Sequence, residues 1–337
     1  MSPPRAVVVG LAGTTLAPAE RRRLAEGQPL GCILFRRNVE DRPQLRALCS
    51  EIRTALGRAD APILVDQEGG RVARLAPPVW RAYPPAARLG ALAERDRTKA
   101  VATAGVLAQR IGLDLAEVGI DWVCAPVADL RLAETHAAIG DRAFAADPAV
   151  VADLAGAMIA GFRSAGVVAI LKHAPGHGRA RVDPHLALPT VTAPRATLAA
   201  DFAPFRALAG VPAAMVAHVV YTALDGERPA SCSPRVVELV RHELGLAGLL
   251  FSDDVDMGAL AGGTGARVRA VLAAGLAAAL QCTGVPADLD AALAAAPPLS
   301  TAARKRLDAA RPLGERSRAE AAALDAALDE ALGAALD

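Results

Sequence analysis

The sequence has few aromatic residues and almost no net charge. Phenylalanine, tryptophan and tyrosine make up 3% of its 337 residues, and 37 lysine and arginine residues nearly balance 36 aspartate and glutamate residues. Proteins that bind nucleic acids commonly present a basic surface, and those that bind single strands add aromatic side chains on which bases stack. We therefore expect no nucleic-acid partner.

The sequence also lacks a long apolar run. A membrane-spanning helix needs roughly 20 consecutive apolar residues, and the alanine-rich stretch near 270–280 is interrupted by Gly275 and Gln281. The apolar stretch 6–9 is too short for the core of a signal peptide. We expect a soluble, cytoplasmic protein with no membrane partner.

Paired cysteines are absent as well. The number of cysteines is odd, they lie far apart, and none forms a Cys-x-x-Cys pair. This pattern favours reduced thiols in a cytosol over a disulfide framework. The five are Cys32, Cys49, Cys124, Cys232 and Cys282.

Short apolar runs alternate with longer amphipathic segments along the chain. Nearly every residue of each run is apolar, which is typical of parallel strands covered on both faces. The expected strands are 6–10, 31–35, 62–66, 121–126, 167–172, 213–217, 248–253 and about 278–283. The expected helices between them are 18–26, 41–56, 97–118, 147–165, 193–208, 233–244 and 266–274.

Eight strand-then-helix units in one series match a closed (β/α)8 barrel, which typically takes about 250 residues. An open, doubly wound sheet is the competing architecture. It would want a phosphate-binding turn, and Gly10 and Gly13 after the first strand lack the spacing of a dinucleotide fingerprint. We predict an α/β protein with a (β/α)8 barrel catalytic domain over 1–300 and a C-terminal helical extension, 301–337, packed on the barrel.

Polar residues stand where the expected strands end. In a barrel of this type the active site lies at the carboxyl ends of the strands, so we expect these side chains to share one rim. They are Asp66, Asp129, Lys172, His173, His218 and Asp253.

The acidic segment Ser252-Asp253-Asp254-Val255-Asp256 has three interpretations. One acid could be a nucleophile, the group could cap the positive end of a following helix, or the oxygens could bind a divalent metal ion. The segment alone leaves all three open.

The stretch 172–189 is rich in proline, glycine and histidine and cannot continue a helix. Long loops of this kind are often functional. Asp183 and His185 are two residues apart, close enough for the carboxylate to orient an imidazole that transfers protons near neutral pH. The alternative is a solvated loop in which His185 bonds only to backbone, and His177 is assigned a loop-shaping role.

Asp66, Lys172 and His173 together suit a ligand with vicinal hydroxyl groups, and a sugar is the obvious candidate. Asp66 and Glu68 could instead form an acid/base pair. We take the single residue between them to separate their side chains, so Asp66 is expected to grip the ligand and Glu68 to be structural. Arg71 and Arg74, one turn apart if a helix starts here, could reach the same ligand.

Taken together, these segments resemble family 3 glycoside hydrolases of the bacterial NagZ type, the β-N-acetylglucosaminidases (β-N-acetylhexosaminidases) of cell-wall recycling. The resemblance runs from about residue 10 to residue 281. The motifs that carry it are GCILFRRN (31–38), DQEGGRVAR (66–74), GIDWVCAPVAD (119–129), GDRAFAADP (140–148), KHAPGHGRARVDPHLALP (172–189), AHVVYTAL (217–224) and FSDDVDM (251–257).

The resemblance implies a retaining, two-step hydrolase that removes terminal β-linked N-acetylglucosamine from peptidoglycan fragments such as GlcNAc-1,6-anhydroMurNAc, with or without peptide. By motif position, Asp253 is the expected nucleophile and His185, paired with Asp183, the expected general acid/base. The residues expected to hold the sugar are Asp66, Arg74, Arg142, Lys172 and His173. No metal ion or organic cofactor is implied, and we expect a monomer.

The chain departs from the family pattern in three places. Ala174 stands where phenylalanine is usual, and Pro184 stands where serine is usual, which fixes φ and removes a donor. Ala277 and Ala278 stand where relatives tend to carry an aspartate. Two rival functions share the motifs: a β-N-acetylglucosaminide phosphorylase with the same covalent intermediate, and a sugar-binding homologue that has lost catalysis.

Overall fold

The computed structural model describes residues 3–184, 186–311 and 321–333. Eight parallel strands close into a barrel, in the order β1-β12-β11-β9-β7-β6-β3-β2. These strands are β1 (Arg5–Gly10), β2 (Pro29–Leu34), β3 (Ile63–Val65), β6 (Trp122–Val123), β7 (Val168–Ala174), β9 (Ala213–Val216), β11 (Leu249–Asp254) and β12 (Ala278–Gln281). Each falls on one of the eight apolar runs, and the predicted (β/α)8 barrel is confirmed.

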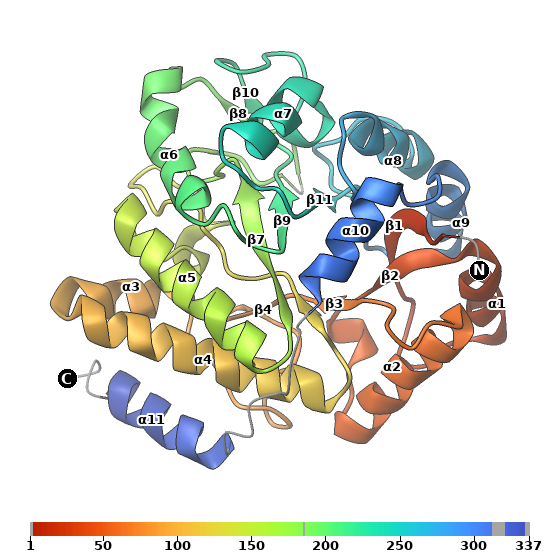
Figure 1. Cartoon of the computed structure of the whole chain (residues 1–337), viewed down its shortest axis with the longest axis horizontal. Helices are drawn as coiled ribbons and strands as arrows, with labels where there is room; N and C mark the ends of the chain where they lie inside the picture. The colour runs from red at the N-terminus through yellow and green to blue at the C-terminus, as the bar shows by residue number, and fades with distance from the viewer. Residues whose placement is uncertain (1–2, 185, 312–320, 334–337) are drawn as a thin grey trace.

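The helices surround the barrel (Figure 1). Those predicted from periodicity are α1 (Pro18–Gly27), α2 (Arg42–Leu56), α4 (Arg97–Glu117), α5 (Pro148–Ser164), α6 (Arg195–Ala207), α7 (Pro234–His242) and α8 (Thr264–Ala273). The capping signals act as expected, because Asp41, Asp147 and Ser233 each accept a hydrogen bond from a first-turn amide. Two further helices that we did not predict are α3 (Ala86–Arg95) and α9 (Pro286–Ala295).

Short elements decorate the rim at the carboxyl ends of the strands. A hairpin is formed by β4 (Gln67–Gly69) and β5 (Val72–Ala73), and a second small sheet by β8 (Thr190–Val191) and β10 (Val220–Tyr221). Three single-turn helices are η1 (Arg36–Asn38), η2 (Gly140–Arg142) and η3 (Ala230–Cys232). These elements lie in the connections after β2, β3, β6, β7 and β9, so they build the walls of whatever site the rim holds.

The C-terminal helices occupy two different places. Helix α10 (Thr301–Ala310) packs Ala303 and Leu307 into the same apolar core as the inward-facing barrel residues Val8 and Phe251. Because Leu299 N–H donates to Pro4 O at the start of β1, α10 covers the amino end of the barrel, where Figure 1 shows it crossing the strands. Helix α11 (Ala321–Gly333) packs on α4.

Ion pairs join α11 to the barrel surface. Arg110 Nε of α4 lies 3.0 Å from Asp325 Oδ1, and Arg81 also pairs with Asp325 and Asp329. Helix α10 shares the interior core of the barrel. The division of the chain at residue 300 stays a prediction.

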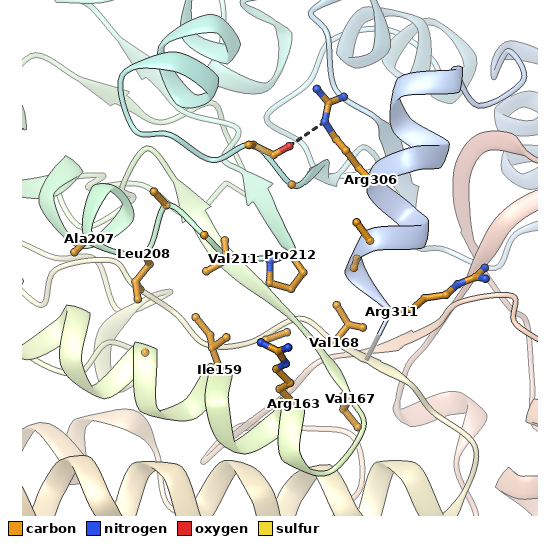
Figure 2. A pocket seen from close by; sticks show the side chains of 18 residues that line it. Ile159, Arg163, Val167, Val168, Ala207, Leu208, Val211, Pro212, Arg306 and Arg311 are labelled. Atoms are coloured by element: carbon orange, nitrogen blue, oxygen red, sulfur yellow. Dashed lines mark hydrogen bonds between the residues drawn. The ribbon is translucent and has the colours of Figure 1, made fainter. Parts of the chain in front are cut away.

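A cavity of about 580 Å³ opens at the amino end of the barrel, beside α10 (Figure 2). Its walls are mainly apolar, with Ile159 and Arg163 from α5, Val211 and Pro212 before β9, and Arg306 from α10. No carboxylate or histidine is among the described residues that line it. This cavity therefore lacks the acid/base groups that bond cleavage requires.

No helix in the described ranges combines the length and the apolarity that crossing a bilayer would require.

Candidate active site

A second, smaller pocket of about 220 Å³ lies at the opposite end of the barrel, where the strands end. It gathers polar groups from five different strand-to-helix connections, as expected for this fold. Its lining includes Asp66, Arg74, Arg142, Lys172, His173, His177, Asp183, Pro184, Asp253, Asp254 and Cys282. All the predicted site residues that the structure describes are therefore brought together; His185 lies outside the described residues.

The β4–β5 hairpin brings Asp66 and Arg74 to the pocket. Gly69 and Gly70 have φ values of 99° and 57°, and an added Cβ at either would collide with Pro84 or Pro85. Gln67 holds the two arms together, since its Oε1 accepts from the amides of Arg74 and Leu75. The helix start suggested for this segment is wrong, because the turn at the two glycines reverses the chain.

Both arginines of the hairpin line the pocket, but their ionic partners differ. Arg74 Nη2 lies 3.1 Å from Asp66 Oδ2 at the pocket. Arg71 Nε lies 3.0 Å from Asp141, and its Nη2 donates to the carbonyls of Ala137 and Ala138. Arg74 therefore belongs to the pocket's ionic network, whereas the contacts of Arg71 stabilise the neighbouring loop.

Lys172 lies at the centre of that network. Its side chain is 2% exposed, and Nζ lies 2.8 Å from Asp66 Oδ1 and 2.6 Å from Glu68 Oε1. Arg142 completes the cluster with two parallel hydrogen bonds to Glu68, Nη2 to Oε1 at 2.8 Å and Nε to Oε2 at 2.9 Å. Such fork-like pairing fixes the plane of both groups.

The predicted separation of the Glu68 side chain from that of Asp66 is wrong, whereas the structural role expected for Glu68 stays a prediction. Residues two apart on an extended strand share a face, and both carboxylates reach the same ammonium group. Glu68 therefore orients Lys172 and Arg142 together. The two-residue spacing could have revealed this from the sequence.

The carboxylates and the ammonium group of this network are ionised at neutral pH. Burial raises the pKa of Asp66, but the opposing charges of Lys172 and Arg74 outweigh it and hold that pKa far below the usual range. The pKa of Glu68 is likewise lowered, because Lys172 and Arg142 outweigh burial. Burial lowers the pKa of Lys172, yet the two carboxylates raise it above its ordinary value. The side chains of Asp66, Glu68, Arg74, Arg142 and Lys172 thus form an ionic wall of the pocket, a fixed array of hydrogen-bond donors and acceptors that stays charged at neutral pH.

A register shift in β7 turns two neighbouring residues toward the pocket. Side chains alternate along a regular strand, but the pairing of β7 with β9 shifts between Leu171 and Ala174. Lys172 and His173 both line the pocket as a result. Ala174, the first departure from the family pattern, is fully buried and pairs with Val216.

Asp253 lies near the end of β11 and is 7% exposed. Burial raises its pKa, but the charges of His173 and His218 outweigh burial and leave the pKa below its usual value. The backbone at this position is fixed by His218, whose Nε2 lies 3.0 Å from Asp254 O while Nδ1 lies 2.6 Å from Ser231 Oγ. Asp253 is therefore an ionised carboxylate in the pocket, the state a nucleophile needs.

The other two acids of the segment have different surroundings. Asp254 Oδ1 accepts from the amide of Asp256, and burial with the neighbouring carboxylates raises the pKa of Asp254 to about 7. Asp256 turns away to the end of β12, where its Oδ2 accepts from the amides of Cys282 and Thr283. Asp256 thereby supplies a carboxylate beside the strand where Ala277 and Ala278 depart from the family pattern.

The described residues include no group of three or more histidine, cysteine, aspartate or glutamate side chains placed to hold a metal ion.

The loop between β7 and β8 reaches over the pocket. Asp183 and Pro184 line it, and Pro184 is buried with its carbonyl accepting from the amide of Ala259, 3.0 Å away in the segment after β11. At the base of the loop, Arg179 Nε lies 2.7 Å from the buried Asp201. This part of the loop is thus held against the connection that follows the Asp253 strand.

The polar groups on this rim suit a glycoside hydrolase, and comparisons with known proteins show that class. Residues 8–311 match the family described as the glycosyl hydrolase family 3 N-terminal domain. The chain belongs to this family. It is an enzyme of the β-hexosaminidase type.

Relatives in sequence and structure support the assignment. A β-hexosaminidase of Stenotrophomonas maltophilia (strain K279a) is 42% identical over 284 residues, 82% of this chain and 83% of the relative. The crystal structure of NagZ from Neisseria gonorrhoeae in complex with N-trifluoroacetyl-D-glucosamine is 33% identical, with a TM-score of 0.88 and 99% of each chain covered. Mycobacterium tuberculosis LpqI is 31% identical, with a TM-score of 0.74, over 98% of this chain and 90% of its own.

Replacing Glu68 by glutamine should lower kcat/KM while the fold persists. The amide keeps the shape of the side chain but loses the charge that pairs with Lys172 and Arg142. Hydrogen bonds to charged groups contribute about 1.5–3 kcal/mol, so we expect a loss of about 10- to 150-fold. Steady-state kinetics on an aryl β-N-acetylglucosaminide measures it.

Glu117→Gln is the matched control, since Glu117 also pairs with two arginines, Arg42 and Arg46, but at a half-exposed surface position. It should leave kcat/KM unchanged. Equal kcat/KM in Glu68→Gln and the unmodified enzyme would refute the role given to Glu68.

Asp254 should make stability depend on pH near neutrality. Its folded-state pKa of about 7 lies above the ordinary value of about 4, so the folded chain holds this proton more tightly than the unfolded chain. Stability from this group is complete below about pH 4 and is lost as pH rises toward 7. Urea unfolding at pH 5 and pH 8 should show a smaller loss on going to pH 8 in Asp254→Asn than in the unmodified protein; parallel losses would contradict the assignment.

Proposed function

We propose that the chain is a retaining exo-β-N-acetylglucosaminidase that acts on peptidoglycan fragments such as GlcNAc-1,6-anhydroMurNAc, with or without peptide. The observation that carries this proposal is the ionised, buried Asp253 facing the Asp66–Lys172–Arg142 wall in a pocket of about 220 Å³. That volume is below the roughly 300–1,000 Å³ of pockets for drug-sized ligands, so it suits one terminal sugar ring.

In this mechanism Asp253 attacks the anomeric carbon and forms a glycosyl-enzyme. Water then hydrolyses the intermediate, so two inversions give retention. We propose His185, oriented by Asp183, as the group that first protonates the leaving oxygen and then deprotonates the water. Most retaining glycosidases use a second carboxylate for this role; a histidine serves it at neutral pH because its ordinary pKa is about 6.5.

The sugar is held by the ionic wall. Asp66, with both its oxygens already facing cations, offers remaining lone pairs to hydroxyl groups, while Lys172, Arg74 and Arg142 supply donors. His173 adds a ring nitrogen beside Asp253. The resemblance to a NagZ structure that contains an N-trifluoroacetylated glucosamine supports an N-acetylamino sugar as the bound unit.

We further propose that the enzyme works in the cytoplasm as a monomer and needs no metal ion or cofactor. Asp253, Asp254 and Asp256 have separate surroundings, and the carboxylate of Asp256 already accepts from Gln281 and two backbone amides. These hydrogen bonds suit Asp256 to fixing the backbone at the end of β12.

Product analysis tests the reaction class. The purified enzyme, incubated with a β-N-acetylglucosaminide in phosphate buffer with and without EDTA, should release free N-acetylglucosamine at equal rates. Sugar 1-phosphate as the main product would establish the phosphorylase instead. Binding of N-acetylglucosamine without any cleavage would establish a sugar-binding homologue, and loss of turnover in EDTA would show that a metal ion takes part.

Trapping tests the nucleophile. A slow aryl or 2-fluoro glycoside should accumulate a covalent adduct, and peptide mass mapping should place it on Asp253. Asp253→Asn should form no adduct and lose at least about 10³-fold in kcat, whereas Asp256→Asn should still be labelled at Asp253. An adduct on any other residue would disprove the assignment.

A further inference from the structure

Asp129 is the most completely buried carboxylate next to the pocket, yet it does not line it. It is 0% exposed and follows β6, and the amide of Ala128 donates to Lys172 O at 2.6 Å, which carries Asp129 alongside the end of β7. Its Oδ2 lies 2.7 Å from Nδ1 of His173. Its Oδ1 accepts from the amides of His177, at 2.6 Å, and His173, at 3.3 Å.

These contacts leave Asp129 charged. Burial raises its pKa, but His173 and the hydrogen bonds it accepts outweigh burial and hold the pKa below its usual value. An ionised carboxylate can only accept hydrogen bonds. The ring nitrogen that faces it, Nδ1 of His173, must therefore carry a proton.

His177 lies beside His173 and also lines the pocket. Its ring lies edge-on to that of His173, with centroids 5.8 Å apart, and neither of its buried ring nitrogens has a hydrogen-bond partner among the described residues. Burial lowers the pKa of His177 to about 4, so this ring is neutral at pH 7.

We propose that Asp129 is a positioning residue that locks the proton of His173 on Nδ1 and turns the Nε2 edge of the ring to the pocket, where it contacts the bound sugar. The ring is fixed at one edge by Oδ2, while the backbone on both sides, at His173 and His177, is fixed by Oδ1. This inference rests on the proposed function for the identity of the ligand, but not for the state of the ring.

The state of the ring is measured directly in the unmodified protein. Nitrogen-15 NMR of the ring of His173 should show Nδ1 protonated at neutral pH, both alone and with N-acetylglucosamine bound. A ring protonated on Nε2 alone would overturn the proposal. Because this readout needs no turnover, it stands apart from any failure of the proposed hydrolase activity.

A double-mutant cycle then tests the coupling to substrate. Asp129→Asn should lower kcat/KM by about 10–100-fold, the size known for carboxylates that orient a metal-bound histidine, since the carboxylate fixes the ring in the same way here. His173→Gln places an amide near the Nε2 position without needing Asp129. Once His173 is Gln, adding Asp129→Asn should cost less than about 3-fold, because both changes act through one ring.

Asp121→Asn is the matched control, since Asp121 accepts from the amide of Ile63 and pairs with Arg53 at the other end of the barrel. It should leave kcat/KM and the His173 spectrum unchanged. Additive losses in the cycle, or an unaltered His173 tautomer in a folded Asp129→Asn protein, would show that Asp129 acts only through the fold. Should Asp129→Asn not fold, the spectrum of the unmodified protein still decides.

Discussion

The active site depends on the contact between Lys172 and two carboxylates. An ammonium group that is 2% exposed would be strongly destabilising without partners, and Asp66 and Glu68 supply them at 2.8 and 2.6 Å. Those partners in turn fix Arg74 and Arg142. One buried cation therefore holds the hairpin after β3, the single-turn helix after β6 and the end of β7 in one arrangement, before any ligand binds.

This arrangement explains why the pocket suits a neutral, hydroxyl-rich ligand. The donors and acceptors already neutralise one another, so a sugar can add hydrogen bonds without bringing a charge that must itself be paired. Preorganised polar groups of this kind need no reorganisation during the reaction. In the proposed mechanism, the positive charge that develops on the sugar ring faces Asp253, whose surroundings keep it ionised.

Much of this could be predicted from the sequence. The eight apolar runs located the barrel strands because strands buried on both faces leave a continuous apolar signal. The short β4–β5 hairpin has no such apolar signal. Its shape depends on the packing of Gly69 and Gly70 against Pro84 and Pro85, which follow about 15 residues later in the sequence. The placement of Asp66, Lys172 and Asp253 on one rim followed from the rule for strand ends.

Other features depended on contacts between segments far apart in the sequence. The sequence does not reveal the ion pair of Glu68 with Arg142, because Arg142 lies 74 residues away. The burial of His177 and its neutrality follow from the packing of the turn after β7, which a glycine-rich stretch does not reveal. Helix α3 was missed for a simpler reason: its first residues follow a proline-rich stretch that reads as a loop.

The position of α10 also bears on how the protein is made. Leu307 and Ala310 complete the same interior core as β1, which is synthesised first. The ribosome releases every residue of the catalytic rim well before these two, so the rim and the strands can be present while the base of the barrel is still open to water. On a chain made at about 5–20 residues per second, that interval lasts on the order of seconds. During this time the apolar interior of the nascent barrel stays exposed to water, until α10 packs against it and covers the amino end.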